Sequence, residues 1–588
     1  MSADERFLMR RGLTRRAWLL RAGLLAGTGL LAACGPAAPA AQTPAPAAPT
    51  TPPAAAKPTT APAAAPTTAP AAAAKPTTPP AAAASTSAPA AGTTAPAAGA
   101  KKGGKLVWAL EQDPVHLIPY GAVPTANMWG KEFMYDSLIA WDRNLAIQPA
   151  LATEWSAPDD HTYVFKLCQG VKFHDGSEVT AEDVKWGIEA QANPPAPGIK
   201  TQYPAKITTI DAVDKYTVRI NMSGPDPSVI GYFAWQRYTP VTPKGIYDKI
   251  NVLTQGIGTG PYKLVEFVPN DRVVYTRNPD FWNKDLPYLD EITLKVLPDE
   301  QARVAALRSG AIDGATFTAD VAKTMANDRN LTVLKGLYAA HKEIQFVLKD
   351  PKNPWSNAKV RQAINHAINR QDIIDKVFGG DASYSSIIPP GYGDWPLSEA
   401  DLKGNYLKYD VDKAKSLLQQ AGFGSGFEME LQSINPPRYI TQSAEVVSEH
   451  LKAVGIKANV VPLEIGTFAK NNADGSYSGA QLTARGMRGD PNGYVTEFHP
   501  KTPIFATWFE GGFLNEELTK TLDDALLTPD QAKRKALYTR AQQILLTEFP
   551  HIPLVQDMKY QVVRSRLKNM YVSYTDFNTG LRESWVEG

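Results

Sequence analysis

One segment of the chain, residues 35–104, restricts where a folded domain can lie. It consists almost entirely of alanine, proline and threonine, and it closes with two lysines and two glycines at 101–104. A segment of this composition buries too little apolar surface to fold. Its prolines make it a semi-extended spacer that reaches on the order of 200 Å when fully stretched. It serves equally well as a linker, a wall-spanning stalk or an O-glycosylated stalk. The fold must therefore be built from the residues that begin near Lys105.

Residues 1–34 have the features of a targeting signal peptide. Paired arginines precede a mostly apolar run, Leu19 to Leu31, which is short for a membrane span. The run ends in Leu31-Ala-Ala-Cys34, which resembles the lipobox of bacterial lipoproteins. The resemblance implies that Cys34 is lipidated and anchors an extracytoplasmic protein to the outer face of the cytoplasmic membrane. Residues 14–20 also resemble a twin-arginine export signal, and a plain transmembrane anchor is the alternative to both.

Composition argues against several classes of protein. The chain has 588 residues, more than one ordinary domain needs. Its formal net charge of +2 gives no general case for a nucleic-acid partner. Cys34 and Cys168 are the two cysteines, too few for a disulfide framework, and Cys168 in an apolar strand is expected to be inert. The eight histidines form no His-x-x-x-His motif, so neither a metal nor a cofactor is predicted.

The stretch 149–184 has a clear local pattern. Apolar residues alternate over 163–167, which is the period of a strand with one buried face. Phe173-His-Asp-Gly176 has the composition of a tight turn, with Gly176 free to take positive φ. Thr180 is placed to cap a helix whose first turn carries acidic residues. We interpret His174 and Asp175 as turn residues and not as a site.

A glycine-rich segment, Gly256-Ile-Gly-Thr-Gly-Pro-Tyr-Lys263, invites comparison with phosphate-binding loops. It lacks the Gly-Lys-Ser/Thr ending of such loops, and its glycines do not open a helix. The residues that follow alternate as in a β-hairpin, with strands expected at 262–268 and 273–277. We therefore do not predict a phosphate site.

Helices and strands alternate along the rest of the chain, which predicts an α/β body. Helices are expected at 125–138, 299–309, 360–378, 411–421, 439–454 and 528–546. Strands are expected at 106–110, 217–222, 311–313, 344–348 and 457–463. Caps are predicted at Asp410 and Thr528. His366 lies off the apolar stripe of its helix and is interpreted as a solvated residue.

Five of these stretches together resemble the family 5 extracytoplasmic solute-binding proteins, the peptide- and nickel-type receptors of ABC importers. They are 149–184, 256–263, 360–370, the helix after Asp410 with its Lys413-Ala-Lys415, and 548–554 with its Glu-Phe-Pro-His-Ile-Pro-Leu sequence. The resemblance implies two lobes joined by crossing segments, with ligand bound between them. Lobe one is then 105–338 with 559–588, its inserted subdomain is 138–222, and lobe two is 339–558.

The same resemblance implies a binding site on lobe two. Peptide-binding members place a Gly-Trp-x-Ala-Asp segment along the ligand, and its aspartate pairs with the ligand's α-ammonium. The matching residues here are Gly486-Met487-Arg488-Gly-Asp490. Asp490 therefore inherits the ammonium-binding role, with a plain turn cap as the alternative. Met487 removes a stacking wall, and Arg488 is expected either to bind a ligand carboxylate or to neutralise Asp490.

Other candidate wall residues come from segments that correspond to the cleft of the family. They are Val123, Asn127, Trp235, Tyr338, Ala340 and His341. Aromatic side chains in such positions can stack on a sugar or cover a cation, although such residues are more often part of the core.

The resemblance implies a monomeric receptor that passes a small polar solute to the permease subunits of an ABC importer. A short peptide is the expected ligand, and an oligosaccharide is the alternative because the chain has twelve tryptophans and a changed pocket motif. Nickel is least expected. A secreted hydrolase is the remote alternative, but the chain has neither a Gly-x-Ser-x-Gly nor a His-Glu-x-x-His motif.

Overall fold

The structure is a computed structural model that describes residues 99–120, 125–192, 206–435, 438–575 and 579–587. The chain divides after Ala81 into two units, and everything below concerns the second. Cys34, the signal peptide and most of the spacer lie outside the described residues, as does Val123. In the part of the chain that is described, no helix combines the length and the apolarity that crossing a membrane requires.

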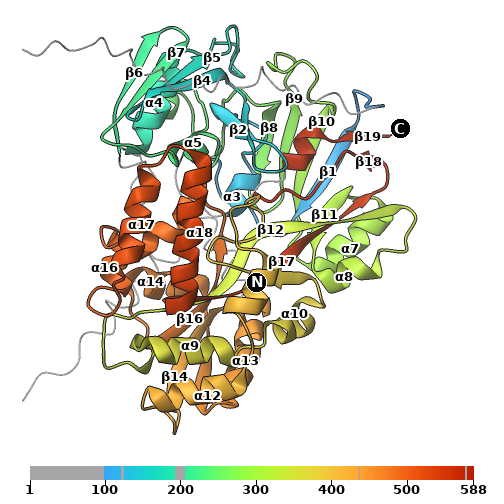
Figure 1. Cartoon of the computed structure of the whole chain (residues 1–588). Helices are drawn as coiled ribbons and strands as arrows, with labels where there is room; N and C mark the ends of the chain where they lie inside the picture. The colour runs from blue at the N-terminus through green and yellow to red at the C-terminus, as the bar shows by residue number, and fades with distance from the viewer. Residues whose placement is uncertain (1–98, 121–124, 193–205, 436–437, 576–578, 588) are drawn as a thin grey trace, which may run out of the picture. The chain divides into compact units, whose positions relative to one another are not determined.

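An eleven-stranded mixed sheet runs through the body, and two long strands form its centre. These are β12 (Leu331–Phe346) and β17 (His551–Arg564), which pair antiparallel (Figure 1). On one side of them lie β16 (Gly479–Gly486), β14 (Phe427–Ile434) and β15 (Ile456–Leu463). On the other side lie β11 (Gly314–Phe317), β1 (Lys105–Leu110), β10 (Glu291–Val296), β9 (Arg272–Arg277) and β8 (Tyr262–Val268). A short strand, β13 (Ala382–Tyr384), also pairs with β17.

The pairing of β12 with β17 is interrupted in the middle. Leu337 is opposite Met558 and His341 is opposite Gln556, with register shifts on both sides of His341. The borders expected from the family, 338/339 and 558/559, fall at this interruption. The two strands thus connect the elements of one predicted lobe to those of the other, as a hinge would require. The exact lobe borders stay a prediction.

A separate four-stranded sheet lies within the region expected to be an inserted subdomain. Its order is β4 (Ala152–Asp159), β5 (Thr162–Leu167), β7 (Thr217–Met222) and β6 (Ile207–Asp214). Helix α4 (Ala181–Ala192) packs against it (Figure 1). Phe165 and Val218 are fully buried in its core. The predicted turn is confirmed, because Gly176 has φ 89° and donates its N–H to the Phe173 carbonyl.

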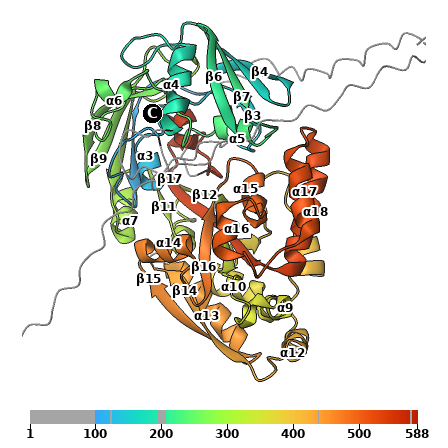
Figure 2. The same cartoon turned by 90° about the vertical axis from the view of Figure 1, so that its left-hand side faces the viewer.

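Helices surround the strands of lobe two. The longer ones are α9 (Ala358–Ala367), α10 (Arg370–Phe378), α12 (Val411–Gln420), α13 (Arg438–Lys452), α14 (Ile465–Asp474), α17 (Glu516–Leu526) and α18 (Gln531–Glu548). Helix α13 packs against β14 and β15, and α17 and α18 lie side by side (Figure 2). One continuous core joins these elements apart from α14. The predicted cap Asp410 is confirmed, since it accepts a hydrogen bond from the third residue of its helix. Asp299, expected as the first residue of a helix, is instead the cap of a helix that begins at Glu300.

The remaining elements are short. The helices are α3 (Thr125–Trp129), α5 (Val229–Phe233), α6 (Ile246–Lys249), α7 (Glu300–Ser309), α8 (Ala319–Thr324), α11 (Glu399–Asp401), α15 (Asn492–Val495) and α16 (Pro503–Trp508), with single turns η1 (Pro354–Ser356), η2 (Leu402–Tyr406), η3 (Thr496–Phe498) and η4 (Thr579–Glu583). The strands are β2 (Ile139–Trp141), β3 (Ile147–Pro149), β18 (Leu567–Lys568) and β19 (Trp585–Val586).

Some predicted elements have different bounds in the structure. The helix expected at 125–138 ends at Trp129. A Cβ on Gly130 would lie 2.6 Å from Pro114, and the carbonyls of Phe133 and Met134 accept hydrogen bonds from Tyr262 and Gly260. Those carbonyls therefore accept hydrogen bonds from the segment that leads into β8 and not from a following helical turn. The strand expected at 311–313 begins at residue 314, and the one expected at 344–348 forms the end of β12.

Two helix predictions in lobe two were wrong in detail. The helix expected at 360–378 is two helices, because Ile368 is extended and Asn369 caps α10 by accepting from Asp372 N. The cap of α18 is Asp530, which accepts from Lys533 N. Thr528 instead donates its hydroxyl to the Asp524 carbonyl of the preceding helix. In both cases the side chain of an asparagine or aspartate accepts from the backbone and starts a helix where none was expected to begin.

Candidate functional site

A cavity of about 630 Å³ lies between elements of the two predicted lobes. From lobe one it is lined by the β2–β3 hairpin, the β4–β5 sheet edge and α5. From lobe two it is lined by residues 392–395, the segment 487–491 and the start of α18. A volume of this size is in the range of small-molecule sites. The cavity is therefore the candidate ligand site.

Aromatic side chains dominate the lining of this cavity. Trp141, Trp155 and Tyr163 come from lobe one, and Tyr392 and Trp395 come from lobe two. Burial raises the pKa of Tyr163 to about 12, so its hydroxyl stays protonated at neutral pH. Tyr392 is held in place because its hydroxyl accepts from Arg488 N and donates to the Arg488 carbonyl. The rings offer flat apolar surfaces to a bound solute.

Asp490 lines the cavity, as predicted, but it already has a cationic partner. Its Oδ1 accepts from Arg534 Nη2 and also from Asn492 N, at 2.8 Å. Arg534 projects from α18 and is 6% exposed. Burial disfavours the charged guanidinium, but the Asp490 carboxylate outweighs burial and raises the pKa of Arg534. The sequence motif offered no signal for this partner, because it lies 44 residues further along the chain.

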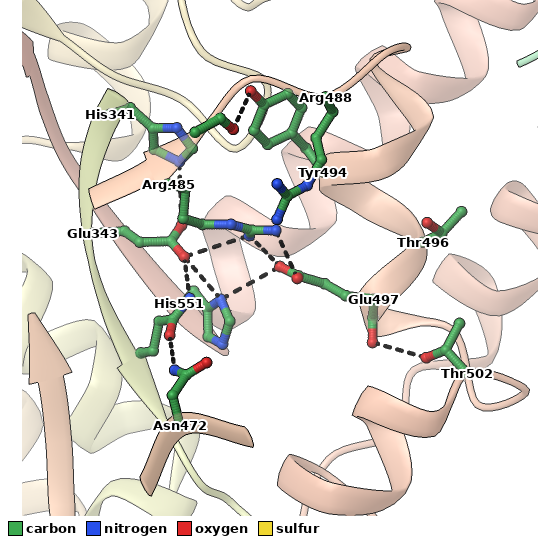
Figure 3. A network of polar contacts seen from close by, with 12 residues as sticks. His341, Glu343, Asn472, Arg485, Arg488, Tyr494, Thr496, Glu497, Thr502 and His551 are labelled. Carbon is green, nitrogen blue, oxygen red and sulfur yellow. Dashed lines mark hydrogen bonds and ion pairs between the residues drawn. The ribbon is translucent and has the colours of Figure 1, made fainter. Parts of the chain in front are cut away.

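Arg488 neither faces Asp490 as a partner nor neutralises it. Its guanidinium lies 5.8 Å from the centre of the Tyr494 ring (Figure 3), and its Nη1 donates to the Met487 carbonyl at 3.5 Å. The predicted neutralising role at Asp490 therefore belongs to Arg534. Met487 is 2% exposed and lines the cavity. Gly486 ends β16, where it is opposite Ala340, and its carbonyl accepts from the Tyr494 hydroxyl.

The candidates at the entry to lobe two belong to strand β12 and do not line the large cavity. Tyr338 is half-buried and its ring lies 5.2 Å from Lys559 Nζ. Ala340 is buried within the β12–β16 pairing. His341 is fully buried, with Nε2 3.3 Å from Glu343 Oε2, and burial lowers its pKa.

A network of buried charges joins β12 to β16, β17 and η3 (Figure 3). The Arg485 guanidinium binds Glu497 through two nitrogens and reaches Glu343 Oε1 at 3.4 Å. His551 Nδ1 lies 3.4 Å from the same Glu343 oxygen. Burial would raise the pKa of Glu343, but Arg485 and the two histidines outweigh it and hold the pKa well below its usual range. The network lies in the interior of lobe two. Through Arg485 it connects β16 to Glu343 and Glu497.

Asn127 and Trp235 also lie away from the large cavity. Asn127 is 1% exposed, accepts from Val115 N and contacts the His116 ring. Trp235 is buried, packs at 5.7 Å against Trp141 and lines a second cavity of about 220 Å³. Trp141 lines both cavities. Trp235 thus supports a wall of the candidate site without forming it.

The backbones of the two predicted lobes meet at a pair of glycines beside the cavity. A Cβ placed on Gly231 of α5 would lie 1.9 Å from the carbonyl oxygen of Gly489. Both glycines line the cavity. Only a residue without a side chain allows this approach, so Gly231 determines how closely the two walls meet.

The turn residues His174 and Asp175 of the stretch 149–184 have a structural role. His174 Nε2 donates to the Gly260 carbonyl at 3.0 Å, and its Nδ1 faces Gly258 N at 3.4 Å. A Cβ on Gly258 or Gly260 would lie 2.2 or 2.4 Å from the carbonyl oxygen of Met134 or Phe133. These glycines allow close backbone packing between residues 256–260 and 133–135. Asp175 accepts from the Ser177 hydroxyl.

The other residues that were discussed as reactive or ligating have ordinary surroundings. Cys168 is half-buried, and burial raises the pKa of its thiol. His366 is half-buried at the end of α9 and donates to the Lys408 carbonyl. Among the described residues, one group could place three metal ligands together: Asp159, Asp160 and His161, all exposed at the β4–β5 turn. It lies in an open hairpin turn and is not part of the candidate site.

Comparisons with known proteins agree with this architecture. The family model for bacterial extracellular solute-binding proteins, family 5 middle, matches residues 146–505. Glutathione-binding protein GsiB of Salmonella typhi is 28% identical over 476 residues, which cover 77% of this chain and 88% of that protein. The GsiB protein of Escherichia coli K12 is also 28% identical, over 477 residues and with the same coverage.

Solved structures show the same fold. The ABC transporter-associated periplasmic binding protein DppA from Helicobacter pylori, in complex with the peptide STSA, has a TM-score of 0.69 at 25% identity, covering 83% of this chain and 99% of DppA. AppA of Bacillus subtilis, in complex with a nonapeptide, has a TM-score of 0.66 at 22% identity, covering 83% and 100%. The chain therefore belongs to the family 5 bacterial extracellular solute-binding proteins, the solute-binding components of ABC transporters.

Proposed function

We propose that this protein is a lipid-anchored monomeric receptor that captures a short peptide in the cavity beside Asp490 and delivers it to the permease of an ABC importer. The observation that carries the proposal is the cavity of about 630 Å³ between two walls that meet at Gly231 and Gly489. Closing two walls around a solute is how a hinge converts binding into a changed shape. A permease can recognise such a change.

The relatives support a peptide as the ligand. GsiB is named as a glutathione-binding protein, and the DppA structure contains a peptide. The cavity lining here adds polar side chains suited to peptide groups, including Asn144, Ser156 and Gln531. These side chains can donate to carbonyls and accept from amides.

An oligosaccharide is the second candidate, because aromatic side chains form much of the cavity wall. Five rings line it: Trp141, Trp155, Tyr163, Tyr392 and Trp395. Flat apolar faces with polar groups at their edges suit a sugar ring as well as a peptide side chain. A hydrolase gains no support, because the two carboxylates among the described lining residues, Asp394 and Asp490, are each paired with a basic side chain.

A melting-temperature screen on the full-length protein tests the binding role. Tripeptides, glutathione, maltotriose and Ni(II)-histidine serve as probes. A true ligand at a thousandfold excess over its Kd stabilises the protein by about 4 kcal/mol. A rise in melting temperature with peptides supports the proposal, and a rise with maltotriose alone selects the second candidate. No rise with any probe would count against the receptor role itself.

Membrane attachment has a separate test. We expect the lipid on Cys34 to hold the protein in the membrane fraction, with the Ala/Pro/Thr spacer giving the body reach. Replacing Cys34 with serine should release the protein into the soluble extracytoplasmic fraction while solute binding stays unchanged. A Cys34→Ser protein that stays in the membrane would contradict the anchor.

A further inference from the structure

We propose that Arg534 occupies, from within the protein, the place of a ligand cation at Asp490, so that the cleft selects solutes that carry no free ammonium group. The inference deepens the proposed function and rests on it, because it concerns the same cavity. It assigns Arg534 as the residue that determines charge selection.

The contacts of Asp490 are the first support. Asp490 Oδ1 accepts from both Arg534 Nη2 and Asn492 N, and the Asp490 side chain is only 15% exposed. Both residues of the pair line the cavity. A carboxylate that is paired in this way presents little net negative potential to a ligand, because the adjacent positive charge cancels its field.

Arg534 is fixed in place and is not a mobile surface side chain. Its guanidinium lies beside two neighbouring rings, 5.4 Å from the centre of Trp395 and 5.2 Å from that of Tyr538. The Tyr538 hydroxyl in turn donates to Asn492 Oδ1 at 2.7 Å. Arg534, Tyr538, Asn492 and Asp490 thus form a closed ring of contacts between α18 and the segment that follows β16.

Displacing Arg534 would be costly for an incoming ammonium. The guanidinium is buried, and its Nε already has no hydrogen-bond partner. Removing Asp490 from it would leave a buried charge uncompensated, which is strongly unfavourable. A solute that binds beside the intact pair avoids this cost.

The rest of the cavity carries no opposing charge among the residues described. Its one other charged lining residue is Asp394, which pairs with Lys535. Each lining carboxylate therefore has a cationic partner, Arg534 within the lining and Lys535 outside it, and the other lining residues are uncharged. The ligand chemistry that fits is an uncharged polar group at the Asp490 wall, such as an acylated amino end of a peptide or a neutral sugar.

The test compares trialanine with N-acetyl-trialanine, which differ in the amino-terminal charge, and adds maltotriose as a neutral sugar. Binding is measured by calorimetry on the full-length protein and on Arg534→Gln and Arg534→Lys. We expect the wild-type protein to bind the acetylated peptide at least tenfold more tightly than trialanine. Arg534→Gln frees Asp490 and should reverse this order, whereas Arg534→Lys keeps a cation and should preserve it.

Several outcomes separate this inference from the proposed function. Equal wild-type affinity for the two peptides overturns the inference but leaves a peptide receptor intact. Binding of maltotriose and neither peptide supports a neutral ligand and overturns the peptide proposal. Failure of Arg534→Gln to acquire trialanine binding, with the variant folded by circular dichroism, also overturns the inference. If Arg534→Gln does not fold, the wild-type comparison alone decides.

Discussion

Arg485 shows how a single residue can stabilise a lobe interior. It is 6% exposed and contacts two carboxylates, those of Glu343 and Glu497. Breaking a buried ion pair by removing one partner typically costs about 3–5 kcal/mol, because the other charges remain buried. We expect Arg485→Met to lower the free energy of unfolding by this amount, measured by urea denaturation with tryptophan fluorescence.

Arg540→Met is the matched control for this prediction. Arg540 pairs with Glu517 on the surface, where both side chains are more than half exposed. Surface pairs contribute little to stability, so this variant should unfold close to the wild-type midpoint. Equal midpoints for the Arg485 and Arg540 variants would contradict the buried network as a source of stability.

His174 gives the protein a predictable response to acid. Burial lowers the pKa of His174 from 6.5 to about 4 in the folded protein. The unfolded chain therefore binds the proton first as the pH falls, and stability is lost between about pH 6.5 and pH 4. The expected contribution is about 3 kcal/mol. Urea midpoints at pH 8, 6 and 4.5 should fall less steeply for His174→Gln than for the wild-type protein.

Glutamine is the appropriate replacement because its side-chain N–H can still donate to the Gly260 carbonyl. At pH 8, where His174 is neutral in both states, the variant should be nearly as stable as the wild-type protein. Parallel pH curves for the two proteins would show that protonation of His174 is not linked to unfolding.

At the residue scale, part of the candidate site could be predicted. Asp490 and Met487 of the motif 486–490 lie at the cavity wall, and their contact with a ligand stays a prediction. Arg534 could not be predicted, because nothing in the sequence of a helix indicates that one of its arginines contacts a carboxylate 44 residues away. The same holds for Trp395 and Trp141, whose rings reach the cavity only through the tertiary arrangement.

At the scale of elements, caps and periodicity predicted most of the longer helices. The errors lie where a side chain that was not expected to be an N-cap begins a helix. Asp410 caps its helix as predicted, whereas Asp299, expected as a helical residue, is the cap of the helix that follows it. The apolar stripe over 360–378 continues through the break at Ile368, so periodicity alone could not reveal two helices. Asn369 was the available signal, since asparagine favours N-caps.

Helix α5 carries the prediction that best tests closure. Gly231→Ala would place a Cβ 1.9 Å from the Gly489 carbonyl, and the two walls would have to move apart. Overpacking of this kind typically costs 1–3 kcal/mol, which corresponds to an affinity about 5- to 150-fold weaker for the solute found in the screen. Calorimetry measures the affinity, and small-angle scattering measures the change in compactness with solute.

Gly224→Ala is the control for this variant. A Cβ at Gly224 meets no heavy atom within 4 Å, and it lies in the same lobe. Its affinity should equal that of the wild-type protein. If Gly231→Ala also binds with wild-type affinity, close approach of the two glycines is not required for binding.

At the scale of the whole body, alternation of helices and strands predicted an α/β class, and the family resemblance predicted its two-lobe arrangement. The order of the large sheet could not be derived from local patterns. Strands β12 and β17 are neighbours although about 200 residues separate them. Their interrupted pairing around His341 is visible only once they are side by side.

The most direct test of this account is native mass spectrometry of the full-length protein, purified from its own host without denaturation. We predict a mass excess that matches one small solute per chain, lost on unfolding and lost or weakened in Gly231→Ala. Fragmentation of the released solute identifies it as a peptide or a sugar. A protein that carries no solute, and that binds none from a concentrated extract of its growth medium, would contradict the central claim that this cavity captures a small polar ligand.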